Sequence, residues 1–284
     1  MKNVIITGAN SGLGFETAKK IAKEKEYRVI LACRNEEKAA AAKQRIIAET
    51  GNENVETMVL DTSLLASVRA FAKEYLSKYN SVDTLINNAG ISAMRGSGLT
   101  EEGFEIVFAT NYLGHFLLTQ LLLPYFAKKG RIINVSSDMH NPPGGIEWKN
   151  VEYLAHEAVS DHSRYSYSKL CMIYLTHKLD EVLKEQASSI CVNAFNPGFM
   201  AATGFSGGHM DKARAFYVKT TMPDRYGELE SSSTALAEVA ISDKYDGISG
   251  KYFDRSFGIK DSSPLSYSKE NAEELWAKSL VFCK

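Results

Sequence analysis

Tyr165 and Lys169 are the residues whose types and spacing point most directly to acid/base chemistry. They stand four positions apart, a spacing that places both side chains on one face of a helix. A free tyrosine has a pKa of roughly 10 and is a poor acid or base near neutral pH, but a neighbouring cation favours the phenolate and lowers that pKa. The pair therefore predicts a proton donor and acceptor that works near neutral pH. The same spacing also describes an ordinary exposed pair on a helix.

A glycine-rich stretch near the start of the chain predicts a phosphate-binding loop. It follows a short apolar run and precedes a helical pattern, with glycines at positions Gly8, Gly12 and Gly14. These glycines let the backbone turn sharply and approach a pyrophosphate, while the N–H groups at the start of the helix point at the anion. The position between a strand and a helix favours nucleotide binding over a simple packing turn.

Arg34 indicates which nucleotide this loop would serve. It ends the second apolar segment, and a site for NAD would place an acidic residue at about this distance from the glycine loop to bond the ribose 2′-hydroxyl. An arginine instead matches a 2′-phosphate, so we expect NADP(H). Asp61 follows the third apolar segment, and from chemistry alone it either accepts a hydrogen bond from an adenine amino group or caps the helix that begins near Leu64.

These residues need a scaffold, and the chain alternates short apolar runs with amphipathic helical patterns. This alternation predicts a doubly wound α/β fold, a parallel sheet with helices on both faces. The expected strands are residues 3–7, 27–33, 55–60, a strand beginning near 85, 131–136 and 190–195. Two long segments after strands, residues 138–162 and 197–228, fall where ligands bind in such sheets. No linker divides the chain, so we expect one domain over residues 1–284.

Composition excludes several other classes of protein. The 284 residues carry a net charge of −1, which argues against a general nucleic-acid binder. The four cysteines lie in apolar surroundings without close pairs, as expected for reduced thiols in the cytoplasm. The six histidines show no metal-ligand spacing, so no metal is expected. The apolar stretch 116–126 is too short to span a bilayer, and we interpret it as a buried or interface helix rather than a membrane contact.

An ordered set of motifs resembles the short-chain dehydrogenase/reductase family. The set is Thr7-Gly8-x-x-x-Gly12-x-Gly14, Asn87-Asn88-Ala89-Gly90, Asn111, Ser136-Ser137, Tyr165-x-x-x-Lys169 and Asn196-Pro197-Gly198. The resemblance implies a three-layer Rossmann-like sheet of about seven parallel strands and a hydride transfer that depends on NAD(P).

The resemblance also implies a role for each matching residue. Tyr165 resembles the general acid/base, and Lys169 the group that lowers the Tyr165 pKa and holds the nicotinamide ribose. Ser137 resembles a second donor to the substrate oxygen, and Asn111 the residue that positions a water in the proton relay. Asp61 and Thr62 match the adenine position. The expected cofactor-binding residues are Gly8, Asn10, Ser11, Gly12, Leu13, Gly14, Arg34, Asp61, Thr62, Asn88, Ala89, Gly90, Pro197, Gly198 and Thr203.

Within the family, the chain is most similar to retinol-dehydrogenase-like and protochlorophyllide-reductase-like members. Phe199 stands where the protochlorophyllide enzymes usually have cysteine. Ala202 stands where the family often has a threonine, and Thr203 follows it. The expected activity is NADP(H)-dependent exchange of hydride with a carbonyl or alcohol on an apolar small molecule. A non-catalytic NADPH-binding regulator and an epimerase or dehydratase are the alternatives.

The expected substrate pocket and assembly follow from the remaining apolar residues. The candidate pocket residues are Ile91, Met94, Met139, His140, Phe199, Met200 and Phe205. The helix over 116–126 and the helix after Tyr165 are either core or the interface of a homodimer or homotetramer. The tail over 268–283 has a helical apolar face, typical of a lid edge, a core cover or a partner surface.

Overall fold

An eight-stranded sheet runs through the chain in the order β3-β2-β1-β4-β5-β6-β7-β8. The computed structural model describes residues 1–93, 98–158, 163–200, 205 and 212–284. The strands are β1 (Lys2–Thr7), β2 (Tyr27–Cys33), β3 (Val55–Val59), β4 (Val82–Asn87), β5 (Phe126–Val135), β6 (Cys191–Asn196), β7 (Tyr252–Asp254) and β8 (Ile259–Lys260).

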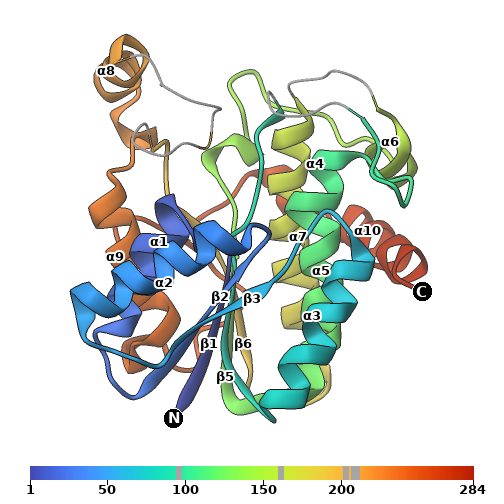
Figure 1. Cartoon of the computed structure of the whole chain (residues 1–284). Helices are drawn as coiled ribbons and strands as arrows, with labels where there is room; N and C mark the ends of the chain where they lie inside the picture. The colour runs from blue at the N-terminus through green and yellow to red at the C-terminus, as the bar shows by residue number, and fades with distance from the viewer. Residues whose placement is uncertain (94–97, 159–162, 201–204, 206–211) are drawn as a thin grey trace.

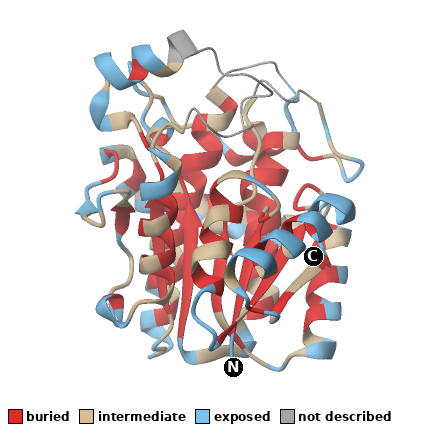
Figure 2. Ribbon diagram, turned by 60° about the vertical axis from the view of Figure 1, so that its left-hand side comes forward, coloured by how far each residue is buried: buried red, intermediate tan, exposed pale blue. Residues whose placement is uncertain are grey.

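Helices cover both faces of this sheet, as Figure 1 shows. The helices that pack on one face are α1 (Gly12–Ala22), α2 (Glu36–Thr50) and α9 (Leu229–Ile241). The opposite face carries α3 (Leu65–Lys78), α4 (Ile106–Phe108), α5 (Gly114–Leu122) and α7 (Ser163–Glu185). Strand β1 supplies Val4 and Ile6 to the first core and Ile5 to the second, because successive side chains point to opposite faces. The central strands β1, β4 and β6 are therefore almost entirely buried (Figure 2).

The expected doubly wound α/β fold is confirmed. Strands β1 to β7 pair in parallel, which agrees with about seven parallel strands, and β8 adds an antiparallel edge. The sequence analysis did not predict β8, since its two residues are exposed and too few to show a period. Helices α6 (Val151–His156) and α8 (Lys212–Thr221) lie at the end of the sheet where the strands finish (Figure 1).

The tail forms helix α10 (Lys269–Phe282), which covers the core. It packs on α5 and α7, where the Trp276 and Phe116 rings meet edge to face at 5.2 Å and the hydroxyls of Tyr112 and Ser279 lie 2.9 Å apart. The stretch Ile106–Tyr125 is long and apolar enough to cross a membrane by length and composition, with a mean hydropathy of 1.4. However, 78% of it is buried inside the fold, as in a core helix of a soluble protein.

Candidate active site

The structure brings Tyr165, Lys169 and Ser137 together. Tyr165 lies in the first turn of α7 and Lys169 one turn later, while Ser137 follows β5. The Lys169 Nζ lies 5.6 Å from the centre of the Tyr165 ring, and the side chains of Ser137 and Tyr165 share a hydrogen bond. Ser137 and Tyr165 are distant in the sequence and meet here because β5 ends beside α7.

The pKa of Tyr165 differs from the expectation. Burial raises the pKa of Tyr165 to about 12, and the hydrogen bond from Ser137 only partly opposes this. Burial also lowers the pKa of Lys169 to about 8, and its ammonium group donates to the carbonyl of Val135 at 2.9 Å. The expected lowering of the Tyr165 pKa is therefore wrong for the chain by itself, because desolvation is the largest influence on that pKa and raises it.

Asn111 lies in a π-helical turn, Ala109–Leu113, inserted between α4 and α5. Such turns occur often at functional sites. Its side-chain oxygen accepts the N–H of Ile91 at 2.8 Å, and its amide nitrogen donates to the Ile91 carbonyl at 3.0 Å and to the Ser168 hydroxyl at 2.9 Å. The Ser168 hydroxyl donates in turn to the Tyr165 carbonyl at 2.7 Å. Asn111 thus joins the segment after β4 to α7.

The glycine loop has the close packing that requires glycine. A Cβ on Gly14 would lie 2.6 Å from the Asn88 Nδ2 atom and 2.7 Å from the Gly8 carbonyl oxygen, while Gly8 itself has a φ of +67°. The Asn88 amide donates to the Thr7 carbonyl at 2.7 Å. Helix α1 begins at Gly12, and its N-cap residue Ser11 makes no side-chain capping bond. The residues expected at the cofactor phosphates (Asn10, Ser11, Gly12, Leu13) thus form a tight turn at a helix N-terminus, which fits a dinucleotide.

Arg34 and Asp61 lie side by side beyond the ends of β2 and β3. Their closest charged atoms, Nη1 and Oδ2, are 3.7 Å apart, and the Arg34 side chain is 73% exposed. The Asp61 Oδ1 atom accepts the backbone N–H and the hydroxyl of Ser63 at 2.9 and 2.6 Å. Asp61 therefore does not cap the following helix.

The cap of that helix comes from elsewhere in the chain. The Glu102 carboxylate accepts the N–H groups of Leu65 and Ala66 at 2.6 and 2.9 Å. Thr62, buried beside Asp61, is fixed by close approach to α5: a Cβ on Gly114 would lie 2.0 Å from the Thr62 carbonyl oxygen. Gly90 lies against Asn111, since a Cβ on Gly90 would come within 3.2 Å of the Asn111 Oδ1 atom, and Ala89 lies against Gly8.

The turn after β6 is tied to the segment that carries Ser137. The Asn196 Oδ1 atom accepts the N–H of Gly198 at 2.9 Å and that of Asp138 at 3.2 Å, and its amide donates to the Asp138 carboxylate at 2.6 Å. The Pro197 carbonyl accepts the Ser232 hydroxyl at 2.7 Å. Thr203, expected at the cofactor, lies outside the described residues.

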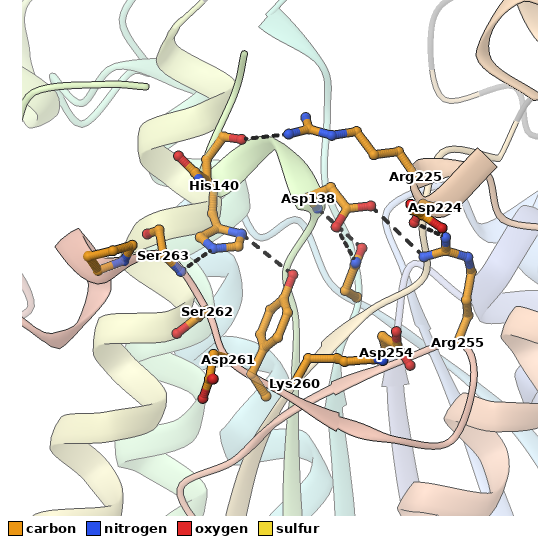
Figure 3. A pocket seen from close by; sticks show the side chains of 14 residues that line it. Asp138, His140, Asp224, Arg225, Asp254, Arg255, Lys260, Asp261, Ser262 and Ser263 are labelled. Carbon is orange, nitrogen blue, oxygen red and sulfur yellow. Dashed lines mark hydrogen bonds and ion pairs between the residues drawn. The ribbon is translucent and has the colours of Figure 1, made fainter. Parts of the chain in front are cut away.

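A polar cavity of about 240 Å³ lies against Asp138 and His140 (Figure 3). The His140 Nδ1 atom donates to the Ser137 carbonyl at 2.7 Å, and its Nε2 atom accepts the N–H of Ser263 at 2.9 Å. Arg255 pairs with Asp138 at 3.9 Å and donates to the Asp224 carbonyl. Both nitrogens of His140 are therefore occupied, so His140 holds the Ser137 backbone and is not a free proton donor to substrate.

The remaining candidate pocket residues lie in different surroundings. The Phe205 ring packs 5.5 Å from the Tyr165 ring, centre to centre, and Met139 is 37% exposed. The Phe199 backbone pairs with the segment at Tyr226, while Ile91 is held by Asn111. Met200 packs against the core beside α9. Met94 lies outside the described residues.

Arg164 is a functional candidate that the sequence analysis missed. It directly precedes Tyr165, is only 3% exposed, and donates to the carbonyls of Tyr153 and Leu154 at 3.0 and 3.3 Å and of Glu157 at 2.5 Å. It thereby caps the C-terminus of α6 and fastens that helix to the start of α7. A charged residue beside the tyrosine was the available signal, but only the fold shows that it is buried.

Comparisons with known proteins show the family to which the chain belongs. A family profile described as short chain dehydrogenase matches residues 2–147. The chain is 37% identical to human retinol dehydrogenase 13, with 98% of this chain and 83% of that protein covered, and 34% identical to zebrafish (Danio rerio) polyprenol dehydrogenase, with 98% and 85% covered. The crystal structure of an uncharacterised protein from Mycobacterium paratuberculosis superposes with a TM-score of 0.77 at 30% identity, covering 100% of this chain and 93% of that one. The chain therefore belongs to the short-chain dehydrogenase/reductase family, oxidoreductases that bind a nicotinamide cofactor and act on alcohol and carbonyl groups.

Proposed function

We propose that this protein is an NADP(H)-dependent reductase or dehydrogenase that moves hydride between the cofactor and a carbonyl or alcohol on an apolar small molecule. The observation that carries the proposal is the meeting of Tyr165, Ser137 and Lys169 beside the carboxyl end of β5. Relatives named for retinol and polyprenol, both apolar alcohols, support this substrate class.

Arg34 supports the choice of NADP(H) over NAD(H). Its guanidinium stands at the end of β2, largely exposed and close to Asp61. An adenosine 2′-phosphate placed there would accept charge-assisted hydrogen bonds from Arg34, whereas a 2′-hydroxyl would gain no comparable partner. The Asp61 Oδ2 atom keeps the guanidinium near the expected adenosine site.

The proton chemistry is assigned to Tyr165 and Ser137. When bound, the nicotinamide supplies or accepts hydride at the substrate carbon. As a carbonyl is reduced, its oxygen gains negative charge, and the hydroxyls of Tyr165 and Ser137 would donate to it together. A Tyr165 whose pKa burial raises to about 12 keeps its proton at neutral pH, which suits the donor required for reduction.

Lys169 and Asn111 would position this donor. The Lys169 ammonium, fixed by the Val135 carbonyl at 2.9 Å, faces the Tyr165 ring and would hold the nicotinamide ribose. Asn111 holds the start of α7 through Ser168, and its role in ordering a relay water remains a prediction.

A panel of aldehydes, ketones and alcohols, followed by NADPH and NADH absorbance, tests the proposed function. We expect turnover of apolar carbonyl compounds such as a retinal, with NADPH preferred over NADH. Tight NADPH binding without turnover of any compound would overturn the proposed activity and favour a non-catalytic regulator. A preference for NADH would overturn the assignment of Arg34.

A further inference from the structure

His115 is a buried residue with a defined hydrogen-bond network that the proposed chemistry does not use. It lies on α5, one turn after Asn111, and is 0% exposed. Its Nδ1 atom lies 3.1 Å from the Asn111 carbonyl oxygen, and its Nε2 atom lies 3.0 Å from the Thr7 hydroxyl. The ring therefore stands between Thr7, at the end of β1, and the Asn111 backbone.

The partners of Thr7 determine the direction of these bonds. Its hydroxyl oxygen accepts the backbone N–H groups of Asn88 and Ala89, each at 2.8 Å. Two accepted bonds fill the lone pairs of a hydroxyl, which is left with one proton to donate. The His115 Nε2 atom at 3.0 Å is a nearer acceptor for that proton than the Ile86 carbonyl at 3.4 Å.

The contact at Nδ1 agrees with Nε2 as the acceptor of the Thr7 proton. A carbonyl oxygen can only accept, so the Nδ1 atom of His115 must carry the hydrogen toward Asn111. A neutral imidazole with its proton on Nδ1 satisfies every partner at once. If Nε2 were protonated as well, its hydrogen and the hydrogen of the Thr7 hydroxyl would both lie between Nε2 and the hydroxyl oxygen.

We propose that His115 is a positioning residue that connects the start of the glycine loop, at Thr7, to α7 by way of Asn111. Its Nε2 atom holds the Thr7 hydroxyl, and its Nδ1 atom holds the Asn111 carbonyl. Thr7 fixes the segment Asn88–Ala89 expected beside the adenosine, while Asn111 fixes Ile91 and, through Ser168, the turn that carries Tyr165. The inference rests on the proposed function, but the NADPH affinity that tests it is measured without any substrate.

The two contacts can be separated by substitution. The amide of an asparagine replaces the Nδ1 side of an imidazole, and the longer glutamine reaches the position of Nε2. His115→Asn therefore keeps the donor to Asn111 and loses Thr7, whereas His115→Gln keeps the acceptor for Thr7 and loses Asn111. His115→Phe preserves a ring and loses both.

The experiment measures three quantities on each variant: the NADPH dissociation constant by titration calorimetry, kcat for a carbonyl substrate, and the melting temperature. We expect His115→Phe to weaken NADPH binding and lower kcat, each about tenfold, the effect of about one buried hydrogen bond. His115→Gln should recover NADPH affinity, and His115→Asn should recover kcat. His177→Gln, which removes a histidine bound to the Ser266 carbonyl away from the site, is the matched control and should change neither.

Equal dissociation constants for the Asn and Gln variants would overturn the inference. So would variants that change only the melting temperature, because a histidine that merely fills space would give that result. If the wild-type chain binds NADPH but reduces none of the carbonyl compounds, the proposed function fails, and the difference in NADPH affinity between the Asn and Gln variants still decides the role of His115.

Discussion

The Arg34 guanidinium lies 3.7 Å from the Asp61 carboxylate, so the two ends of the expected adenosine site are joined by an ion pair. Because the Arg34 side chain is largely exposed, the pair contributes little to stability. Its main consequence is the direction in which Arg34 is held. A bound 2′-phosphate would compete with Asp61 for the guanidinium.

Substitution of Arg34 should change cofactor choice more than folding. We expect Arg34→Gln to weaken NADPH binding by roughly 10- to 150-fold, as for the loss of hydrogen bonds to a charged group, and to leave NADH binding nearly unchanged. Titration of both cofactors checks this. Arg45→Gln, another exposed arginine, is the control. Equal losses for both cofactors would contradict the assigned contact.

The activity in the direction of reduction should fall above pH about 8. Lys169 loses its proton in this range because burial lowers its pKa to about 8, and the neutral amine no longer supplies the positive charge beside Tyr165. Tyr165 itself, with a pKa of about 12, stays protonated. The pH dependence of kcat measures this, and Lys169→Arg should move the fall to higher pH because arginine remains charged. The same fall in wild type and variant would exclude Lys169 as its cause.

The stability of the fold should decrease as the pH falls below about 6.5. Burial lowers the pKa of His115 to about 4 and also lowers those of His140 and His177. An unfolded histidine binds its proton near pH 6.5, so the unfolded state binds more protons in the window between these values. The contribution is therefore complete above pH 6.5 and is lost as the pH falls toward about 4.

Urea unfolding at pH 7 and pH 5 measures this effect. His115→Gln should reduce the pH dependence by up to about 1.4 kcal/mol per pH unit in that window. An identical pH dependence in the wild type and His115→Gln would show that His115 is not held neutral.

Arg164 should matter to the substrate side of the site more than to the cofactor. Arg164→Met removes the donors to the carbonyls of Tyr153 and Leu154, and we expect a loss of about 1–3 kcal/mol in the free energy of unfolding. Since α6 would loosen beside Tyr165, kcat/KM for substrate should fall while NADPH affinity is kept. Arg45→Met is the control, and a larger effect on NADPH than on substrate would contradict this role.

Much of the site was predictable because its signals are local. The glycine loop, Arg34 and the pair Tyr165 and Lys169 each lie in a short segment, and parallel strands bring their carboxyl ends to one edge. Contacts between distant segments were not predictable. His115 meets Thr7 across 108 positions, and Glu102 caps a helix 37 positions away.

The Tyr165 pKa shows the same limit in physical terms. A lysine four residues away can be read from the sequence, and it predicts a lower pKa. The extent to which the hydroxyl is buried depends on the whole fold, and this burial raises the pKa to about 12. The two-residue strand β8 likewise has no period that a sequence could reveal.

Tyr165→Phe tests the central claim most directly, since it removes one oxygen and keeps the ring that packs on Phe205. NADPH affinity and carbonyl reduction are measured on the same preparation, with Tyr167→Phe, whose hydroxyl donates to the Glu147 carbonyl, as the control. We predict that Tyr165→Phe lowers kcat by about 10²- to 10⁴-fold with nearly unchanged NADPH binding. Carbonyl reduction at the wild-type rate by Tyr165→Phe would contradict the assignment of Tyr165 as the acid.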